Sequence, residues 1–187
     1  MAAVESHSGE TFALPTALAE RGFVLRPETE ADIPFLRRLY ASTRSDELAL
    51  TNWTDAQKLA FTDSQFGLQR YHYRTYYPTA EWGVLEGNGV PAGRLYLNRG
   101  SQTVEVMDIA LLPQWRGRGV GTALLQAVCA MARDSGKAVI AYVEKFNPAQ
   151  RLYRRLGFRE VSDEGAQWLM EWRAEPDLSG GDQLKIA

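Results

Sequence analysis

A glycine-rich turn between an apolar strand and an apolar helix constrains this chain more than any other feature. The segment 113–122 reads PQWRGRGVGT; it follows the strand-like run 102–112 and leads into a helical pattern over 120–133. A helix that begins in this way presents unpaired backbone N–H groups and the positive end of its dipole, which together bind phosphate. Glycine lets the main chain approach an anion without a clash from Cβ. The turn therefore predicts an anion site, to which Arg116 and Arg118 add positive charge.

Two common phosphate-binding patterns do not fit this turn. A P-loop requires a lysine directly after its last glycine, and no lysine follows these glycines. A dinucleotide fold requires a third glycine where Thr122 stands, and only one strand–helix–strand unit is present. Glu144, at the end of the next strand, nevertheless stands about where a ribose-binding acid would sit, so a dinucleotide-dependent enzyme stays an alternative.

The net charge of −2 conceals a basic block around the turn. Residues 114–159 carry nine Lys and Arg against two Asp and Glu, a charge of +7, which leaves −9 for the rest of the 187-residue chain. The overall charge argues against a nucleic-acid partner. One cysteine and two distant histidines exclude an internal disulfide and a cysteine-based zinc site, so no metal is expected.

Neither a membrane span nor a signal peptide is expected. No apolar run reaches the ~18–20 residues that a span needs. Residues 1–10 are acidic and polar, without the basic start and apolar stretch of a signal peptide. We therefore expect a cytoplasmic protein without membrane contact.

The remaining pattern predicts a single α/β domain over residues 21–173. Residues 1–20 read as a loose lead-in and residues 174–187 as a polar tail. Alternating and apolar runs predict strands over 22–26, 81–86, 90–98, 102–112, 137–143, 158–161 and 167–173. Helical spacing predicts helices near 33–40, 55–73 and 120–133, and one with Asn147 as its N-cap and Pro148 as its first residue.

Two segments resemble the signatures of the GCN5-related N-acetyltransferase (GNAT) superfamily. Residues 116–121 (RGRGVG) fit the pattern R/Q-x-x-G-x-G/A, and residues 147–158 (NPAQRLYRRLGF) are similar to N-x-x-[AQ]-x-x-L-Y-x-x-L-G-F. The two segments lie one helix and one strand apart, as in the family. The similarity extends over about 23–173, although residues 27–80 match only in the order of their elements.

The resemblance implies a mixed, mostly antiparallel sheet of six to seven strands flanked by helices. The strands near 104–112 and 137–143 should run parallel and splay apart, and acetyl-CoA should enter between them as cosubstrate. The resemblance assigns cofactor contacts to Ile109, Ala110, Leu111, Arg116, Gly117, Arg118, Gly119, Val120, Gly121, Thr122, Asn147 and Tyr153.

The resemblance also implies direct attack of a primary amine, on a small molecule or a protein, on the thioester. Tyr153 holds the family's proton-donor position. Glu105 is the expected general base and Asp108 its rival; strand alternation places them on opposite faces unless a bulge intervenes. Reaction of the free amine without a dedicated base is the third alternative. Cys129 lies mid-helix beside the apolar stripe and is expected to be a core residue. A non-catalytic acyl-CoA-binding sensor on the same fold is the alternative function.

The acceptor region allows two interpretations. Residues 69–77 (QRYHYRTYY) hold four tyrosines, one histidine and two arginines. They form either an aromatic wall in which Arg70 or Arg74 binds an anionic group of the acceptor, or core tyrosines with solvated arginines. Both a monomer and a homodimer are compatible with the family.

Overall fold

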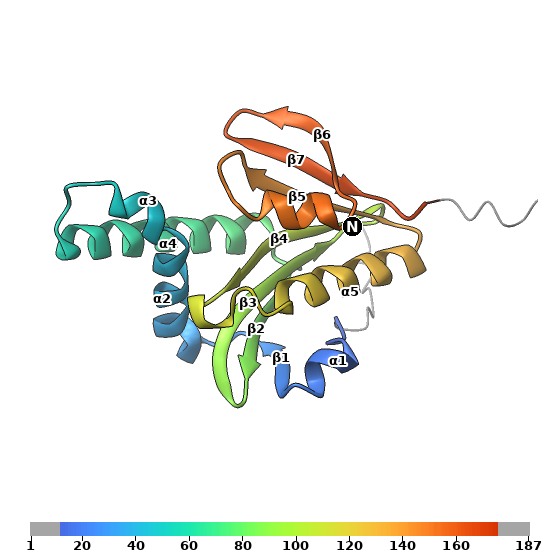
Figure 1. Cartoon of the computed structure of the whole chain (residues 1–187), viewed down its shortest axis with the longest axis horizontal. Helices are drawn as coiled ribbons and strands as arrows, with labels where there is room; N and C mark the ends of the chain where they lie inside the picture. The colour runs from blue at the N-terminus through green and yellow to red at the C-terminus, as the bar shows by residue number, and fades with distance from the viewer. Residues whose placement is uncertain (1–11, 176–187) are drawn as a thin grey trace, which may run out of the picture.

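The structure, a computed structural model, describes residues 12–175 as a seven-stranded mixed sheet with helices on both faces (Figure 1). The strands are β1 (Phe23–Pro27), β2 (Glu81–Gly87), β3 (Val90–Arg99), β4 (Thr103–Leu111), β5 (Ala138–Glu144), β6 (Arg159–Glu164) and β7 (Gln167–Trp172). The helices are α1 (Thr16–Ala19), η1 (Glu30–Asp32), α2 (Ile33–Thr43), α3 (Ser45–Ala49), α4 (Asp55–Tyr76), η2 (Pro113–Trp115), α5 (Val120–Asp134) and α6 (Gln150–Arg155). The strand order β1-β2-β3-β4-β5-β7-β6 confirms the predicted fold class.

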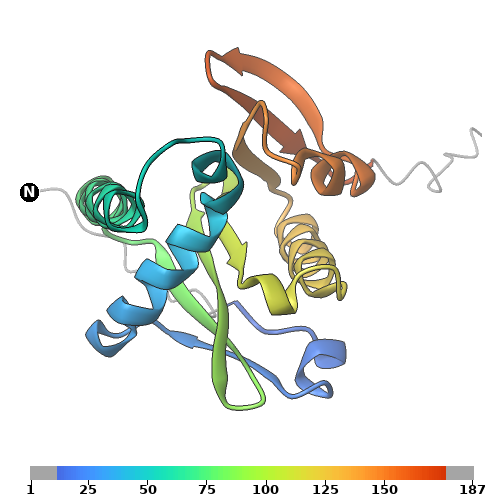
Figure 2. The ribbon, with the colours of Figure 1, turned by 60° about the vertical axis from the view of Figure 1, so that its left-hand side comes forward.

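Two hydrophobic clusters hold the helices on the sheet. Helix α5 buries Leu124, Leu125 and Val128 against one face, where the strands present alternate apolar residues. Helices α2 and α4 bury Leu36 and Phe66 against the other face. Figure 2 shows α5 on one side of the sheet and α2 with α4 on the other. Each fully buried side chain of this size contributes about 1.5–3 kcal/mol.

Strands β4 and β5 separate soon after they begin. They run parallel and pair only from Thr103↔Ala138 to Glu105↔Ile140. Farther on, β4 stays paired with β3 as far as Leu111, and β5 stays paired with β7 as far as Glu144. Within the described residues, the facing edges of the two strands beyond this point have no strand partner. The predicted splay is therefore confirmed.

A bulge in β4 changes which side chains share a face. Tyr96 pairs with Asp108 and Leu97 with Val106, so Met107 is an extra residue in β4. Val106 lies in the cluster under α5, so Glu105 faces the opposite side, toward α4. The extra residue also turns Asp108 toward α4. The two candidate bases therefore lie on the same face of the sheet. Strict strand alternation would have placed them on opposite faces, and the bulge accounts for the difference.

Three local predictions are wrong. Residues 12–20 are not a loose lead-in, because they include α1 and bury Phe12 and Leu18 in the core under α5. Helix α6 begins at Gln150 rather than at Pro148, since residues 148–149 form a turn first. The short helix α3 has no counterpart among the predicted elements. The rest of the predicted lead-in and tail, residues 1–11 and 176–187, lies outside the described residues.

Within residues 12–175, no helix is both long and apolar enough to cross a bilayer.

Candidate active site

The glycine-rich turn is open to an incoming anion. Gly117 and Gly119 have φ values of +69° and +77°, a region in which a residue with a Cβ is strained. Both are exposed, and a Cβ at either would meet no atom within 4 Å. Gly119 is the N-cap of the 15-residue helix α5. Among the described residues, the N–H groups of residues 117–122 have no hydrogen-bond partner, so they remain available to a ligand.

Arg116 fixes the turn in place. Its Nε donates to the carbonyl of Leu111 at 2.7 Å, and its Nη2 donates to the carbonyl and hydroxyl of Ser42 at 3.1 and 3.0 Å. These bonds join the turn to the end of β4 and to the C-terminal part of α2. Arg116 therefore positions the turn, in addition to the positive charge that the sequence predicted.

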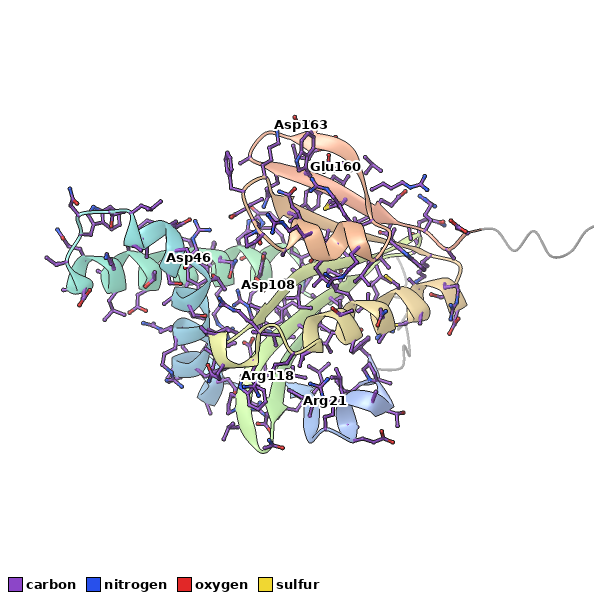
Figure 3. The ribbon with its side chains drawn as sticks, viewed as in Figure 1. Arg21, Asp46, Asp108, Arg118, Glu160 and Asp163 are labelled. Carbon is purple, nitrogen blue, oxygen red and sulfur yellow. The ribbon has the colours of Figure 1, made fainter. Side chains whose placement is uncertain are left out.

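Two arginines outside the first signature also reach the turn. Arg21, between α1 and β1, donates to the carbonyl of Arg118 at 3.0 Å, and Figure 3 shows the two side by side. Arg155 of α6 donates to Thr122 Oγ1 at 3.4 Å. Arg155 belongs to the basic block of residues 114–159, but the sequence did not indicate that it lies beside the turn. No sequence signal singled out Arg21, because 97 residues separate it from Arg118.

Tyr153 is placed to keep its proton. It lies on α6, is 5% exposed, and packs edge-on against Phe158 with ring centroids 5.1 Å apart. Burial raises the pKa of Tyr153 above its ordinary value, and the charge of Asp108 raises it further. A protonated phenol at neutral pH suits the proton-donor role predicted for it.

The two candidate bases differ in their partners. Asp108 accepts from Nε and Nη2 of Arg94 at 2.9 and 2.7 Å, and Arg94 also donates to Gln69 of α4 at 2.9 Å. Arg94 is buried, so Asp108 serves to neutralise it. Glu105 is half-buried and accepts a long bond from Asn98 Nδ2 at 3.3 Å. Among the described residues, no Lys or Arg forms an ion pair with Glu105, which leaves its carboxylate available.

The remaining predicted site residues lie beside the separated strands or in the core. The backbone of residues 109–111 runs along the open edge of β4. Asn147 is exposed after β5, and its Oδ1 accepts from the N–H of Ala149 at 2.9 Å. Cys129 lies on the buried face of α5, and burial raises the pKa of its thiol to about 12, so it stays a neutral core residue. Among residues 12–175, no group of three or more His, Cys, Asp or Glu is arranged to hold a metal ion.

The arginines of the tyrosine-rich segment are already neutralised. Arg70 and Arg74 both donate to the carboxylate of Glu28, the Arg74 bond being 2.7 Å long, and Arg70 also donates to Glu30 at 2.9 Å. Burial would raise the pKa of Glu28, but bonds from Tyr96 and these arginines hold it below its usual range. Neither arginine is free to bind an anionic group of an acceptor.

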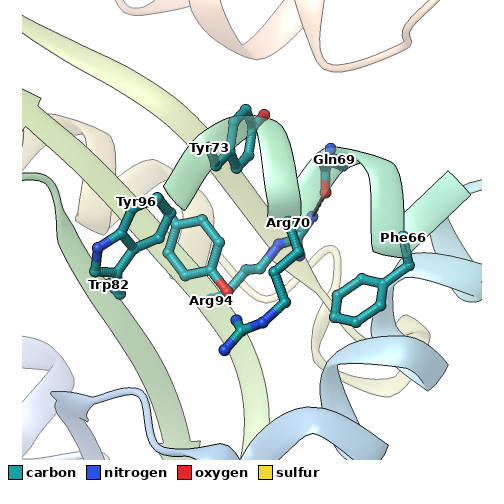
Figure 4. Close-up of a pocket in the computed structure, with 7 residues that line it drawn as sticks. All are labelled: Phe66, Gln69, Arg70, Tyr73, Trp82, Arg94 and Tyr96. Carbon is teal, nitrogen blue, oxygen red and sulfur yellow. Dashed lines mark hydrogen bonds between the residues drawn. The ribbon is translucent and has the colours of Figure 1, made fainter. Parts of the chain in front are cut away.

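Beside this ion-pair network lies a small pocket between α4 and the sheet (Figure 4). Its lining residues are Phe66, Gln69, Arg70, Tyr73, Trp82, Arg94 and Tyr96. Its two arginines are held by Glu28, Glu30, Asp108 and Gln69, so the pocket wall carries no free positive charge.

Comparison with known proteins identifies the class to which this fold and this turn belong. The profile of the Acetyltransferase (GNAT) family matches residues 43–158, more than half of the chain. The chain therefore belongs to the GNAT family of acetyltransferases, which confirms the resemblance seen in its two signatures.

Individual relatives agree with this assignment. An N-alpha-acetyltransferase of Sulfurisphaera tokodaii is 37% identical over 87 residues, which are 45% of this chain and 48% of that protein, so the alignment spans about half of the relative. A PaiA N-acetyltransferase from Thermoplasma acidophilum, solved with coenzyme A, superimposes with a TM-score of 0.62 at 14% identity, over 81% of this chain and 99% of that one. The YncA protein of Salmonella typhimurium, solved with acetyl-CoA, has a TM-score of 0.51 at 24% identity, over 84% and 96%. These two structures share the fold.

Proposed function

We propose that this chain transfers an acetyl group from acetyl-CoA to a primary amine by direct attack of the amine on the thioester. The observation that carries the proposal is the early separation of β4 and β5 directly beside the open turn. Amide groups of a pantetheine arm can pair with the free edge of β4 at residues 109–111, while the pyrophosphate meets the N–H groups of residues 117–122. The coenzyme A and acetyl-CoA bound to two structural relatives support this donor.

The chain's own groups account for the three demands of the reaction. An alkylammonium with a pKa near ~10 must lose a proton, which Glu105 accepts directly or through a water. The oxyanion that forms when nitrogen bonds to the carbonyl carbon is stabilised by backbone N–H groups near residues 110–111. The carbon–sulfur bond then breaks and Tyr153 donates its proton to the departing thiolate, while the proton that the new amide nitrogen loses passes to the Tyr153 oxygen, directly or through water. We propose that residues 21–173 form this catalytic unit, with residues 12–20 packed against it.

An acceptor screen tests the proposal. The full chain is incubated with acetyl-CoA and, in turn, alkylamines, amino acids, polyamines, aminoglycosides and peptides with free N-termini, and release of the free thiol is followed. We expect release with at least one class, together with an acetylated product by mass spectrometry. Binding of acetyl-CoA without release in any arm would contradict the enzyme and support a non-catalytic acyl-CoA sensor.

Substitution of Gly119 by alanine should weaken donor binding specifically. The φ of +77° strains any residue with a Cβ by about 1–2 kcal/mol, and the new methyl group lies where the phosphate approaches. We expect the Kd for acetyl-CoA, measured by calorimetry, to rise by about tenfold or more, or about 1.4 kcal/mol.

Gly89→Ala is the matched control for this change. Gly89 has a φ of +76° and equally open surroundings, but it lies in the turn between β2 and β3. Both variants should lose similar stability, and only Gly119→Ala should lose affinity. Equal affinities for acetyl-CoA in the two variants would show that the turn does not hold the phosphates.

Replacement of Glu105 by glutamine should slow the reaction in a pH-dependent way. We expect kcat/KM at neutral pH to fall by about tenfold or more, because the amide cannot accept the proton of the ammonium. The deficit should shrink as the pH approaches ~10, where the free amine forms without a base. Glu164→Gln, at an exposed carboxylate on the edge strand β6, is the control and should leave the profile unchanged. A deficit that is constant across this pH range would exclude Glu105 as the base.

A further inference from the structure

Glu105 and Tyr142 point to the α4 face of the sheet where β4 and β5 separate. Glu105 is the last residue of β4 that pairs with β5, and its partner is Ile140. Val139, Ala141 and Val143 point into the core under α5, so Ile140 and Tyr142 point to the other face, the one that Glu105 shares. Tyr142 is 46% exposed there.

Helix α4 brings a second tyrosine to the same place. The hydroxyl of Tyr73 donates to the carbonyl of Met107 at 3.2 Å, which fixes where the helix crosses β4. Tyr77 is the C-cap of α4, four residues after Tyr73, or about 6 Å farther along the helix axis. Glu105 lies two residues before Met107, a similar distance along the strand. Burial raises the pKa of the half-buried Tyr77, and the neighbouring Glu105 and Tyr142 raise it further, as expected for groups in close proximity.

The charges on this face favour a cation. Glu105 has no Lys or Arg partner among the described residues. Arg44 forms ion pairs with Glu47 at 2.8 Å and with Glu144 at 3.1 Å. These three side chains together carry one excess negative charge. Arg94 and Asp108 cancel each other. A group bound beside Glu105 therefore meets one carboxylate without a Lys or Arg partner among the described residues and two tyrosine rings, whose faces attract cations; Glu144 lies farther along β5 on the same face.

We propose that Tyr77, Tyr142 and Glu105 hold the ammonium group of the acceptor, and that the acceptor is a primary amine with no carboxylate next to its amino group. The proposal rests on the proposed function, since it places the acceptor of that reaction. Tyr77 and Tyr142 are positioning residues, whereas Glu105 goes on to take the proton. A carboxylate next to the amine would lie beside Glu105 and be repelled.

Binding of small ammonium probes to the full chain tests the site directly. The tyrosine rings are labelled with ¹³C, and the signals of Tyr77 and Tyr142 are assigned from Tyr77→Phe and Tyr142→Phe. Propylammonium should shift these two signals saturably, whereas propanol and propionate should not. Alaninamide should bind more tightly than alanine by about fivefold or more, because the two differ in the carboxylate. Equal effects of the charged and neutral probes, or shifts confined to other tyrosines, would overturn the proposal.

Substitutions of Tyr142, the exposed tyrosine on β5, provide a second test. Tyr142→Ala should weaken propylammonium binding by about threefold or more, and Tyr142→Phe should retain it, because the ring supplies the attraction. Tyr71→Ala, at a 72% exposed tyrosine on α4, is the matched control and should have no effect. With an accepted amine, the loss in Tyr142→Ala should appear in KM and not in kcat; a loss in kcat alone would contradict a positioning role.

Titration of the same sample with acetyl-CoA separates the two proposals. Donor binding without an ammonium response at Tyr77 and Tyr142 would contradict only the acceptor site. An ammonium response without donor binding would contradict the proposed acetyl transfer instead.

Discussion

Tyr153→Phe is expected to lower kcat by about 10²-fold or more while leaving the affinity for acetyl-CoA unchanged. The change removes one hydroxyl and keeps the ring that packs against Phe158, so the fold should survive. The thiolate then departs without its proton donor. Steady-state kinetics with an accepted amine, combined with calorimetry of donor binding, measure the two effects separately.

Tyr40→Phe is the matched control for this experiment. Tyr40 is also a buried tyrosine, at 8% exposure, but it lies in the cluster of α2 and α4. Its loss of a hydroxyl should not change kcat. Because burial raises the pKa of Tyr153, the wild-type activity should show no loss from deprotonation of this residue below about pH 10. Unchanged turnover in Tyr153→Phe would show that another group, or water, protonates the thiolate.

Asp108→Asn is expected to reduce the free energy of unfolding by about 3 kcal/mol or more. The amide leaves the guanidinium of Arg94 buried without a counter-charge, since Gln69 offers only a neutral oxygen. Urea denaturation followed by circular dichroism measures the loss.

Two further variants show whether the loss arises from the unpaired charge. Asp63→Asn removes one partner of the exposed Arg37–Asp63 pair, which is worth about 1 kcal/mol or less. A double variant with Arg94→Met and Asp108→Asn should recover much of the stability, because no buried charge is left unpaired. A loss in Asp108→Asn as small as that in Asp63→Asn would mean that Asp108 is not bound to Arg94 and is free to act as a base.

The parts of the site that depend on local sequence were predictable. The glycines of the turn and the position of Tyr153 follow from two short segments whose backbone conformation is set by their own residues. The bulge at Met107 was not predictable, because it depends on the register between β3 and β4 rather than on the residues of one strand. That single residue decides that Glu105 and Asp108 share a face.

The part of the site expected to bind the acceptor was not predictable, because it depends on contacts between residues that are far apart in the sequence. Arg70 and Arg74 are neutralised by Glu28, which lies 42 and 46 residues earlier, together with Glu30. The sequence therefore could not distinguish arginines available to a substrate from arginines held in the protein. The same holds for Tyr142 and Tyr77, whose proposed role depends on the strand register and on where α4 crosses β4.

Calorimetric titration of the full chain with acetyl-CoA, alongside NAD and NADP, tests the central claim most directly. The separated strands and the open turn predict saturable binding of acetyl-CoA and none of either dinucleotide. Binding of a dinucleotide without binding of acetyl-CoA would contradict the account.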